Sequence, residues 1–203
     1  MKRQIEGVAE QLLDCAAKEF LDKGFADASL REIAKQCGVS THSIYTRFQD
    51  KAGLFDAVVE QTLKDIEDLK RSFYERNYKR LDDHTLIQMW DMSLETHQYW
   101  INYFYDRFED MKLLLCSAQG SHHADFLHDF VAENTKVCAK FVEEARNRDL
   151  PHNDISEKEL HLLLTAYWTT IFEPIIHDFS WQEALEHCKY VCQFFNWQAI
   201  FGF

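Results

Sequence analysis

The sequence predicts an all-α protein, and three observations support that class. Apolar side chains recur at helical spacing over most of the chain, as Leu12, Ala16 and Phe20 do near its start. The 203 residues include only 6 glycines and 2 prolines, so residues that break helices are rare. No segment alternates apolar and polar residues over the length of a strand. We therefore expect helices connected by short turns.

The starts of several helices are marked by side chains that can accept hydrogen bonds from the unpaired amides of a first helical turn. These residues are Ser29, Ser40, Asp50, Ser156 and Ser180. Ser29, Ser156 and Ser180 are each followed three positions later by glutamate, the spacing of a capping box. With the apolar spacing, these signals predict helices over residues 2–23, 29–37, 40–48, 51–75, 83–107, 109–117, 121–148, 156–178 and 180–200.

The segment 29–55 has the pattern of a helix-turn-helix. Gly38 supplies the permissive backbone of a tight turn, and Ile44 and Phe48 share the inward face of the second helix. The outward face carries short hydrogen-bonding side chains and a cation, which are Thr41, His42, Ser43, Thr46 and Arg47. Because such groups suit the major groove, the segment predicts binding to double-stranded DNA.

The acidic charge of the chain is unevenly distributed. The formal net charge is −12, yet residues 1–52 contain eight Lys/Arg and eight Asp/Glu. The whole excess of acid therefore lies in residues 53–203. An acidic body repels DNA phosphates and confines contact to the N-terminal part of the chain. This division supports a DNA-binding domain over residues 1–50 and a second helical domain over residues 51–203.

Several other features favour a cytoplasmic protein. No apolar run approaches the ~20 residues of a membrane span. The first helix is amphipathic and carries acidic residues, unlike a signal or transit peptide. The six cysteines include no C-x-x-C pair and no zinc-finger spacing. No order of residues suggests a catalytic nucleophile, so we expect no enzyme and no cofactor.

Residues 5–59 resemble the N-terminal domain of the tetracycline-repressor (TetR) family of transcriptional regulators. The matching elements are Ala17 and Phe20, Gly24-Phe25, Ser29-Leu30-Arg31-Glu32-Ile33-Ala34, Gly38-Val39-Ser40, Ile44-Tyr45, Phe48, Lys51 and Leu54-Phe55. The chain departs from the family pattern at Cys37, where a small apolar residue is more usual, and at residues 41–43, where many members carry a glycine. Neither departure threatens the fold.

The resemblance implies roles for particular residues of the DNA-binding domain. Thr41 and His42, together with Arg31 from the preceding helix, lie where the family reads bases. The positions at which the family contacts phosphates are Ser43, Tyr45, Thr46, Arg47 and Lys51. Ser40 contributes through the helix start.

The resemblance further implies a C-terminal helical ligand-binding domain and a homodimer formed mainly by the last two helices. Most members are repressors that leave the operator when a small molecule binds. For this chain we expect a palindromic operator and a signal that passes through the 51–75 helix. The aromatic residues expected around a ligand cavity are Trp90, Trp100, Phe104, Phe126, Phe130, Tyr167, Trp168 and Phe172. The interspersed acids Asp91, Glu95 and Glu133 suggest a bulky aromatic or cationic effector.

The last two helices are apolar on more than one side, which favours a partner subunit. The interface candidates are Leu162, Leu163, Ala166, Thr170, Phe194 and Phe195. Pro174 is expected to kink the first of these helices near Thr170, because proline removes one backbone hydrogen bond.

Two alternative functions remain open at this point. A helix over residues 121–148 places His122, Asp125 and Asp129 on one face with His128 nearby, which suits a divalent metal in a helix-bundle metalloprotein or metalloenzyme. The other alternative is a constitutive DNA-binding protein without an effector, against which the fixed helix-turn-helix pattern and the acidic body both argue.

Overall fold

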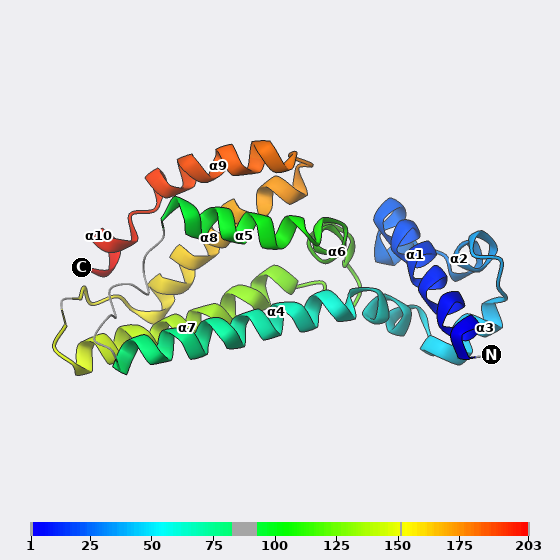
Figure 1. Ribbon diagram of the computed structural model, residues 1–203, viewed down its shortest axis with the longest axis horizontal. Helices are drawn as coiled ribbons and strands as arrows, with labels where there is room; N and C mark the ends of the chain where they lie inside the picture. Colours follow the sequence, from blue (N-terminus) through cyan, green and yellow to red (C-terminus); the bar gives the residue numbers. More distant parts are fainter. Residues whose placement is uncertain (1, 83–92, 151, 203) are drawn as a thin grey trace. The chain divides into compact units, whose positions relative to one another are not determined.

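The computed structural model describes residues 2–82, 93–150 and 152–202, and every regular element within them is helical (Figure 1). The predicted all-α class is confirmed. The helices are α1 (Lys2–Asp27), α2 (Leu30–Gln36), α3 (Thr41–Phe48), α4 (Lys51–Asp82), α5 (Leu94–Tyr105), α6 (Phe108–Lys112), the π-helical turn η2 (Leu113–Ser117), α7 (Phe126–Asn147), α8 (Glu157–Ile176), α9 (Trp181–Phe194) and α10 (Trp197–Phe201). None of these described helices has the length and apolar character needed to cross a membrane.

Four of the five predicted capping residues are confirmed. The side-chain oxygens of Ser40, Ser156 and Ser180 accept backbone amides three residues on, at 3.2–3.3 Å. Asp50 Oδ1 accepts the amide of Gly53 at 2.8 Å. Only Ser180 forms a reciprocal capping box, in which its own amide donates to the Glu183 carboxylate.

The predicted capping box at Ser29 is wrong, because the Ser29 side chain makes no capping hydrogen bond. The amide of Ser29 instead donates to Glu19 Oε1 at 3.2 Å. The predicted end of the first helix is confirmed, because the helix is interrupted at the non-helical Gly24, with φ of 74°, before a short helical segment continues α1 to Asp27.

The helix predicted over residues 83–107 begins only at Leu94, because Ser93 is extended and caps α5; residues 83–92 lie outside the described part of the chain. Two further predicted helices also differ from the structure. Residues 121–125 form turns, and α7 begins only at Phe126. The predicted single helix over 180–200 is two helices, because the chain leaves the helix at Phe195 and Asn196 caps α10. Both Phe195 and Trp197 are buried and stack at 5.8 Å, an arrangement that follows from the break between them.

The chain divides into two compact units. The first comprises residues 1–66 and 107–126, and the second comprises residues 67–106 and 127–203. In the first unit α1 packs against α2, α6 and η2, and α2 packs against α3. Its core includes Phe20, Phe25 and Phe55, whose rings lie 5.0–6.0 Å apart. This core holds the helix-turn-helix against the start of α4.

In the second unit α5, α8 and α9 pack against one another. The second half of α4 runs beside α7 (Figure 1), and Lys70 of α4 forms an ion pair with Glu133 of α7 at 2.6 Å. Pro174 lies inside α8, which continues to Ile176. Pro174 has no amide hydrogen to donate to the carbonyl of Thr170, four residues earlier. That carbonyl instead accepts a hydrogen bond from His187 Nε2 of α9 at 3.1 Å.

Candidate nucleic-acid interface and aromatic core

The outer surface of α3 presents the polar residues predicted to contact DNA. Ile44 is the buried residue of this helix and anchors it in the core of the first unit. His42, Tyr45, Thr46 and Arg47 are exposed, with 52% of the Tyr45 surface accessible to solvent. Tyr45 thus presents a large flat ring with a terminal hydroxyl to solvent, where the ring does not pack in the core.

Three hydroxyls of the predicted contact set also shape α3 itself. Ser40 Oγ accepts the amide of Ser43 and lies 3.0 Å from Ser43 Oγ. Thr46 Oγ1 donates to the carbonyl of His42 at 2.8 Å. The hydroxyl protons and lone pairs used in these bonds are committed to the helix. Direct contact to a ligand therefore depends more on the longer side chains of the same face.

Arg31 and Arg47 are the cations best placed for such contact. Both are exposed, one on α2 and one on α3, and neither forms an ion pair within the described part of the chain. By contrast Lys35, on the same helix as Arg31, pairs with Glu32 at 3.4 Å. An exposed guanidinium without an acidic partner can bind a guanine edge or a phosphate without first breaking an ion pair.

Lys51 was predicted to contact phosphate, and the structure gives it bonds inside the fold. Its ammonium donates to the carbonyls of Ala26 at 2.8 Å and Ala28 at 3.2 Å. It also lies 4.8 Å from the centre of the Phe25 ring. Lys51 therefore ties the start of α4 to the segment between α1 and α2.

Glu19 positions α2 and was missed by the sequence analysis. Its carboxylate is buried and accepts the amide of Ser29 at one end of α2 and the Gln36 side chain at the other, at 3.2 and 3.3 Å. The available signal was its spacing, since Glu19 falls on the same helical face as Leu12 and Ala16. A carboxylate on an apolar face requires buried hydrogen-bond donors.

Gly53 was also missed. A side chain at this position would overlap the backbone carbonyl of Phe48, so only glycine lets the end of α3 approach the start of α4 this closely. The orientation of α3 relative to α4 therefore depends on this residue.

Most of the predicted effector residues form a continuous aromatic core in the second unit. Phe104 lies 4.8 Å from Phe172, and Trp168 contacts Trp100 at 5.3 Å and Phe130 at 4.8 Å. All five rings are at least nine-tenths buried. Tyr167 joins the same core through Trp168 at 5.3 Å. Phe126 is also buried but is the last residue of the first unit, and Trp90 lies outside the described residues.

The acids proposed to favour a cationic effector give that idea no support. Glu133 is neutralised by Lys70, whose ammonium lies 5.2 Å from the centre of the Phe130 ring. Glu95 is exposed, and Asp91 lies outside the described residues.

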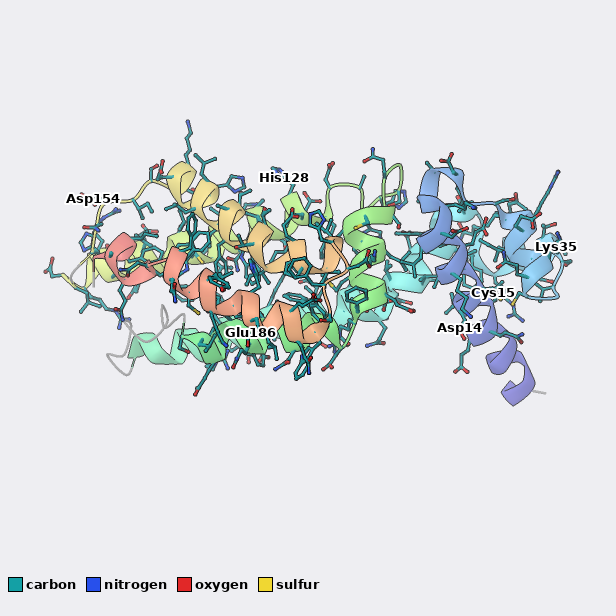
Figure 2. All side chains as sticks on the ribbon, turned by 90° about the horizontal axis from the view of Figure 1, so that it is seen from above. Asp14, Cys15, Lys35, His128, Asp154 and Glu186 are labelled. Carbon is teal, nitrogen blue, oxygen red and sulfur yellow. The ribbon has the colours of Figure 1, made fainter. Side chains whose placement is uncertain are left out.

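The predicted metal cluster is not assembled in the described part of the chain, where no group of three His, Cys, Asp or Glu could hold an ion. His128 lies exposed on α7 (Figure 2). His122 and His123 instead approach one carboxylate, that of Asp56, at 3.4 and 3.1 Å. The turn at residues 121–125 explains the difference, because a shared face requires a helix that is not present there.

The interface candidates divide into exposed and buried side chains. Leu162 of α8 and Phe194 of α9 expose 63% and 80% of their surface, and Ala166 is exposed as well. Leu163 and Thr170 are half-buried. Phe195 is only 7% exposed, so its assignment to an interface is corrected: it packs on Tyr167 at 5.4 Å.

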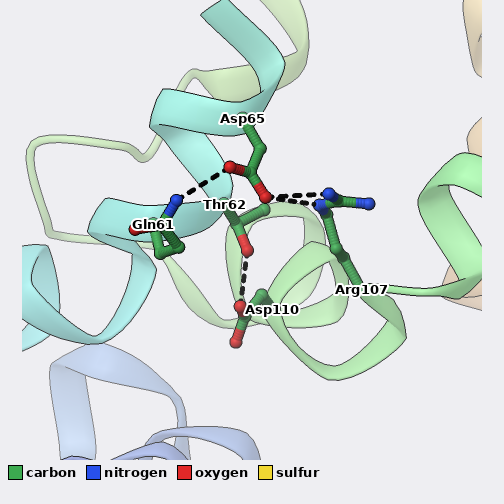
Figure 3. A network of polar contacts seen from close by, with 5 residues as sticks. All are labelled: Gln61, Thr62, Asp65, Arg107 and Asp110. Atoms are coloured by element: carbon green, nitrogen blue, oxygen red, sulfur yellow. Dashed lines mark hydrogen bonds and ion pairs between the residues drawn. The ribbon is translucent and has the colours of Figure 1, made fainter. Parts of the chain in front are cut away.

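A polar network joins α4 to the start of α6 within the first unit (Figure 3). Asp65 accepts two hydrogen bonds from Arg107, at 2.8 and 3.0 Å, and one from Gln61. These bonds, led by those of Arg107, hold the pKa of Asp65 below its ordinary value. Thr62 donates to Asp110 at 2.5 Å. The network fixes α6 against the middle of α4.

Comparisons with known proteins agree with this arrangement. Residues 12–58 match the family model for bacterial regulatory proteins of the tetR family. The HTH-type transcriptional regulator AcrR of Shigella flexneri is 33% identical over 72 residues, which are 36% of this chain and 34% of that protein. The HTH-type transcriptional regulator YdgC of Bacillus subtilis is 32% identical over 74 residues, 36% of this chain and 38% of that protein. The chain thus spans about a third of the curated relatives it matches.

Solved structures extend the likeness to the whole fold. NalD, the secondary repressor of the MexAB-OprM multidrug efflux pump in Pseudomonas aeruginosa, has a TM-score of 0.63 and 18% identity, covering 97% of this chain and 98% of that one. The regulator CifR, solved with a 26 bp double-strand operator DNA, has a TM-score of 0.56 and 18% identity, covering 90% of this chain and 94% of that one. At these identities the likeness shows a common fold.

Proposed function

We propose that this chain, which belongs to the tetR family of bacterial regulatory proteins, is a repressor that binds a palindromic operator as a homodimer and leaves it on binding a small hydrophobic or aromatic effector. The observation that carries the proposal is the outer face of α3. His42, Tyr45 and Arg47 are exposed on this helix, and the buried Ile44 anchors it in the core. On this proposal the chain acts by binding and has no catalytic role.

The DNA contact follows from the placement of the charges. Arg31 and Arg47 provide guanidinium groups on α2 and α3, and the excess acid of the chain lies beyond residue 52. Two copies of α3 in a symmetric dimer enter successive major grooves when they are about 34–36 Å apart. Thr41 and His42 at the start of α3 then face base edges, with Arg31 beside them, while Tyr45 and Arg47 face phosphates.

The dimer is supported by exposed apolar side chains on two helices that pack together. Leu162 of α8 and Phe194 of α9 are largely exposed, as is Tyr190 of α9 at 69%. Large apolar side chains exposed in this number on adjacent helices are typical of an interface. The covered faces of α8 and α9 already pack against the rest of the second unit, so the exposed faces remain for a partner subunit.

The effector signal has a covalent route between the two units. Helix α5 carries Trp100 and Phe104 of the aromatic core and ends at Tyr105, and Arg107 follows two residues later. Arg107 grips Asp65 of α4, the helix whose first turn follows α3. On this proposal, a displacement of α5 moves α4 through the Arg107–Asp65 contact. The distance between the α3 helices of the two subunits then changes. An effector that leaves operator affinity unchanged at fixed salt overturns this switch.

Selection from a genomic fragment library at one near-physiological salt concentration tests the proposal. The wild-type chain is expected to enrich a palindrome, and Tyr45→Ala combined with Arg47→Ala to enrich none. Because a dimer presents Arg47 twice, Arg47→Ala alone should reduce the slope of log affinity against log salt by about 2.

Lys64→Ala is the matched control for the loss of one exposed cation. Lys64 lies on α4 and pairs with Glu60 at 2.6 Å, outside the predicted contact set. For Lys64→Ala, the slope of log affinity against log salt should equal that of the wild type. Enrichment of no sequence by the wild-type chain, or equal slopes for Arg47→Ala and wild type, contradicts the proposal.

A further inference from the structure

Three buried polar atoms around Tyr167 have no hydrogen-bond partner among the residues that the structure describes. They are His97 Nε2, the Tyr167 hydroxyl and Trp197 Nε1. The three residues are 0%, 1% and 3% exposed, so solvent does not reach them. Buried polar side-chain atoms are nearly always hydrogen-bonded, and each exception calls for an explanation. Three such atoms in one cluster can therefore bond a molecule that enters it.

The three side chains come from different helices and meet at Tyr167. The His97 ring of α5 and the Trp197 ring of α10 each lie edge-on to the Tyr167 ring of α8, with centroids 5.5 Å away. The break at residues 195–196 makes this possible, because it lets α10 place Trp197 beside Tyr167. The cluster is continuous with the aromatic core through Trp168.

The donor and acceptor roles of the three atoms can be assigned. His97 Nδ1 lies 2.8 Å from the carbonyl of Ser93 and 3.3 Å from Cys192 Sγ; because the carbonyl is the nearer neighbour and only accepts, Nδ1 carries the proton. Burial lowers the pKa of His97, which keeps the ring neutral and leaves Nε2 as a bare acceptor. The indole Nε1 of Trp197 only donates, and the Tyr167 hydroxyl can donate or accept.

The surroundings of the three atoms favour an uncharged partner. Burial raises the pKa of Tyr167 well above its ordinary value, and the thiols of Cys188 and Cys192 reinforce the shift. Phe195 packs on Tyr167 from another side. An ion placed among aromatic rings and neutral thiols is poorly solvated, so a charged group is disfavoured here.

We propose that the effector is a neutral molecule with an aromatic body and a hydroxyl group that bonds to His97, Tyr167 and Trp197. One hydroxyl provides a single donor and two acceptor lone pairs. It therefore donates to His97 Nε2 and accepts from the Tyr167 hydroxyl and from Trp197 Nε1. This inference rests on the proposed function and names the chemical class of its effector.

The arrangement also explains how such an effector acts on the fold. The closed cluster leaves three hydrogen bonds unmade, and an effector supplies them only when the rings of α5, α8 and α10 part to admit it. The effector thus binds the opened state in preference to the closed one, which is the requirement for shifting an equilibrium between two conformations.

Calorimetric titration of the full chain without DNA tests the site with four probes of one size. The probes are 2-naphthol, naphthalene, 2-methoxynaphthalene and 2-naphthoate. We expect 2-naphthol to bind about tenfold or more tightly than the other three, because only it has a neutral hydroxyl that both donates and accepts. Tyr167→Phe should remove most of this preference and leave naphthalene binding unchanged. Tyr99→Phe, at a tyrosine of α5 that exposes 47% of its surface, is the matched control and should bind all four as wild type does.

A second measurement guards against variants that misfold. Because the Tyr167 hydroxyl makes no bond in the fold, Tyr167→Phe without ligand should melt at or above the wild-type temperature. A fall of about 3 °C or more means that the hydroxyl is already bonded and overturns the inference. Equal affinity for all four probes, or binding of none, overturns it as well.

These outcomes are distinguishable from failure of the proposed function. A chain that prefers 2-naphthol but enriches no operator upholds the hydroxyl site and refutes the repressor. A chain that enriches an operator but does not prefer 2-naphthol refutes the hydroxyl site alone.

Discussion

Replacing Glu19 tests whether the helix-turn-helix is positioned by a buried carboxylate or by local capping. The carboxylate bridges Ser29 and Gln36 across the length of α2, and both bonds join uncharged donors to a charged acceptor. Hydrogen bonds to charged groups contribute about 1.5–3 kcal/mol each, part of which is regained when water reaches the freed donors. We therefore expect Glu19→Ala to lower the free energy of unfolding by about 2–4 kcal/mol.

Two further variants separate the two explanations. Glu19→Gln keeps an oxygen that can accept the Ser29 amide, so it should cost about half as much as Glu19→Ala. Ser29→Ala should change stability by less than about 0.5 kcal/mol, since the Ser29 hydroxyl caps nothing, whereas a working N-cap contributes about 1 kcal/mol. Urea titration followed by circular dichroism measures all three. If Ser29→Ala lowers the free energy of unfolding by more than Glu19→Ala does, the proposal that Glu19 positions α2 is refuted.

Three other predictions follow from single contacts. Gly53→Ala should abolish operator binding and lower the melting temperature, because its methyl group overlaps the Phe48 carbonyl; wild-type melting would contradict this. His187→Phe leaves the Thr170 carbonyl without its donor and should cost about 1–3 kcal/mol in urea titration, and a neutral result would show that another donor replaces it. Since burial lowers the pKa of His97 from 6.5, the unfolded chain takes up a proton near pH 6.5 that the folded chain does not. Stability should therefore fall with acidification below that value, by at most about 1.4 kcal/mol per pH unit, and less steeply in His97→Gln.

Helix starts could be predicted from the sequence wherever the interaction is local. Ser40, Asp50, Ser156 and Ser180 each bond an amide three residues away, and that contact exists whatever the rest of the chain does. Ser29 has the same sequence pattern but fails, because the distant Glu19 takes its place. A capping box in the sequence therefore predicts where a helix begins more reliably than it predicts which group caps it.

The composition of the aromatic core was also predictable, but its polar part was not. The resemblance placed Phe104, Trp168 and Phe172 around a ligand cavity, and the structure buries them together in a packed core. Helical spacing predicted one helix through residues 195–196 and so gave no reason to place Trp197 near Tyr167. The structure ends α9 at Phe194 and buries both Phe195 and Trp197 beyond that end.

Lys51 has contacts inside the fold that the sequence did not predict. The resemblance to the family places it at a phosphate, and that role stays a prediction. Its ammonium holds two carbonyls of the segment 26–28, which the rest of the helix-turn-helix requires in place. Loss of DNA affinity in Lys51→Ala would therefore combine a lost charge with a displaced α4. Arg47 has no such internal bonds among the described residues, so its salt dependence measures the electrostatic contact alone.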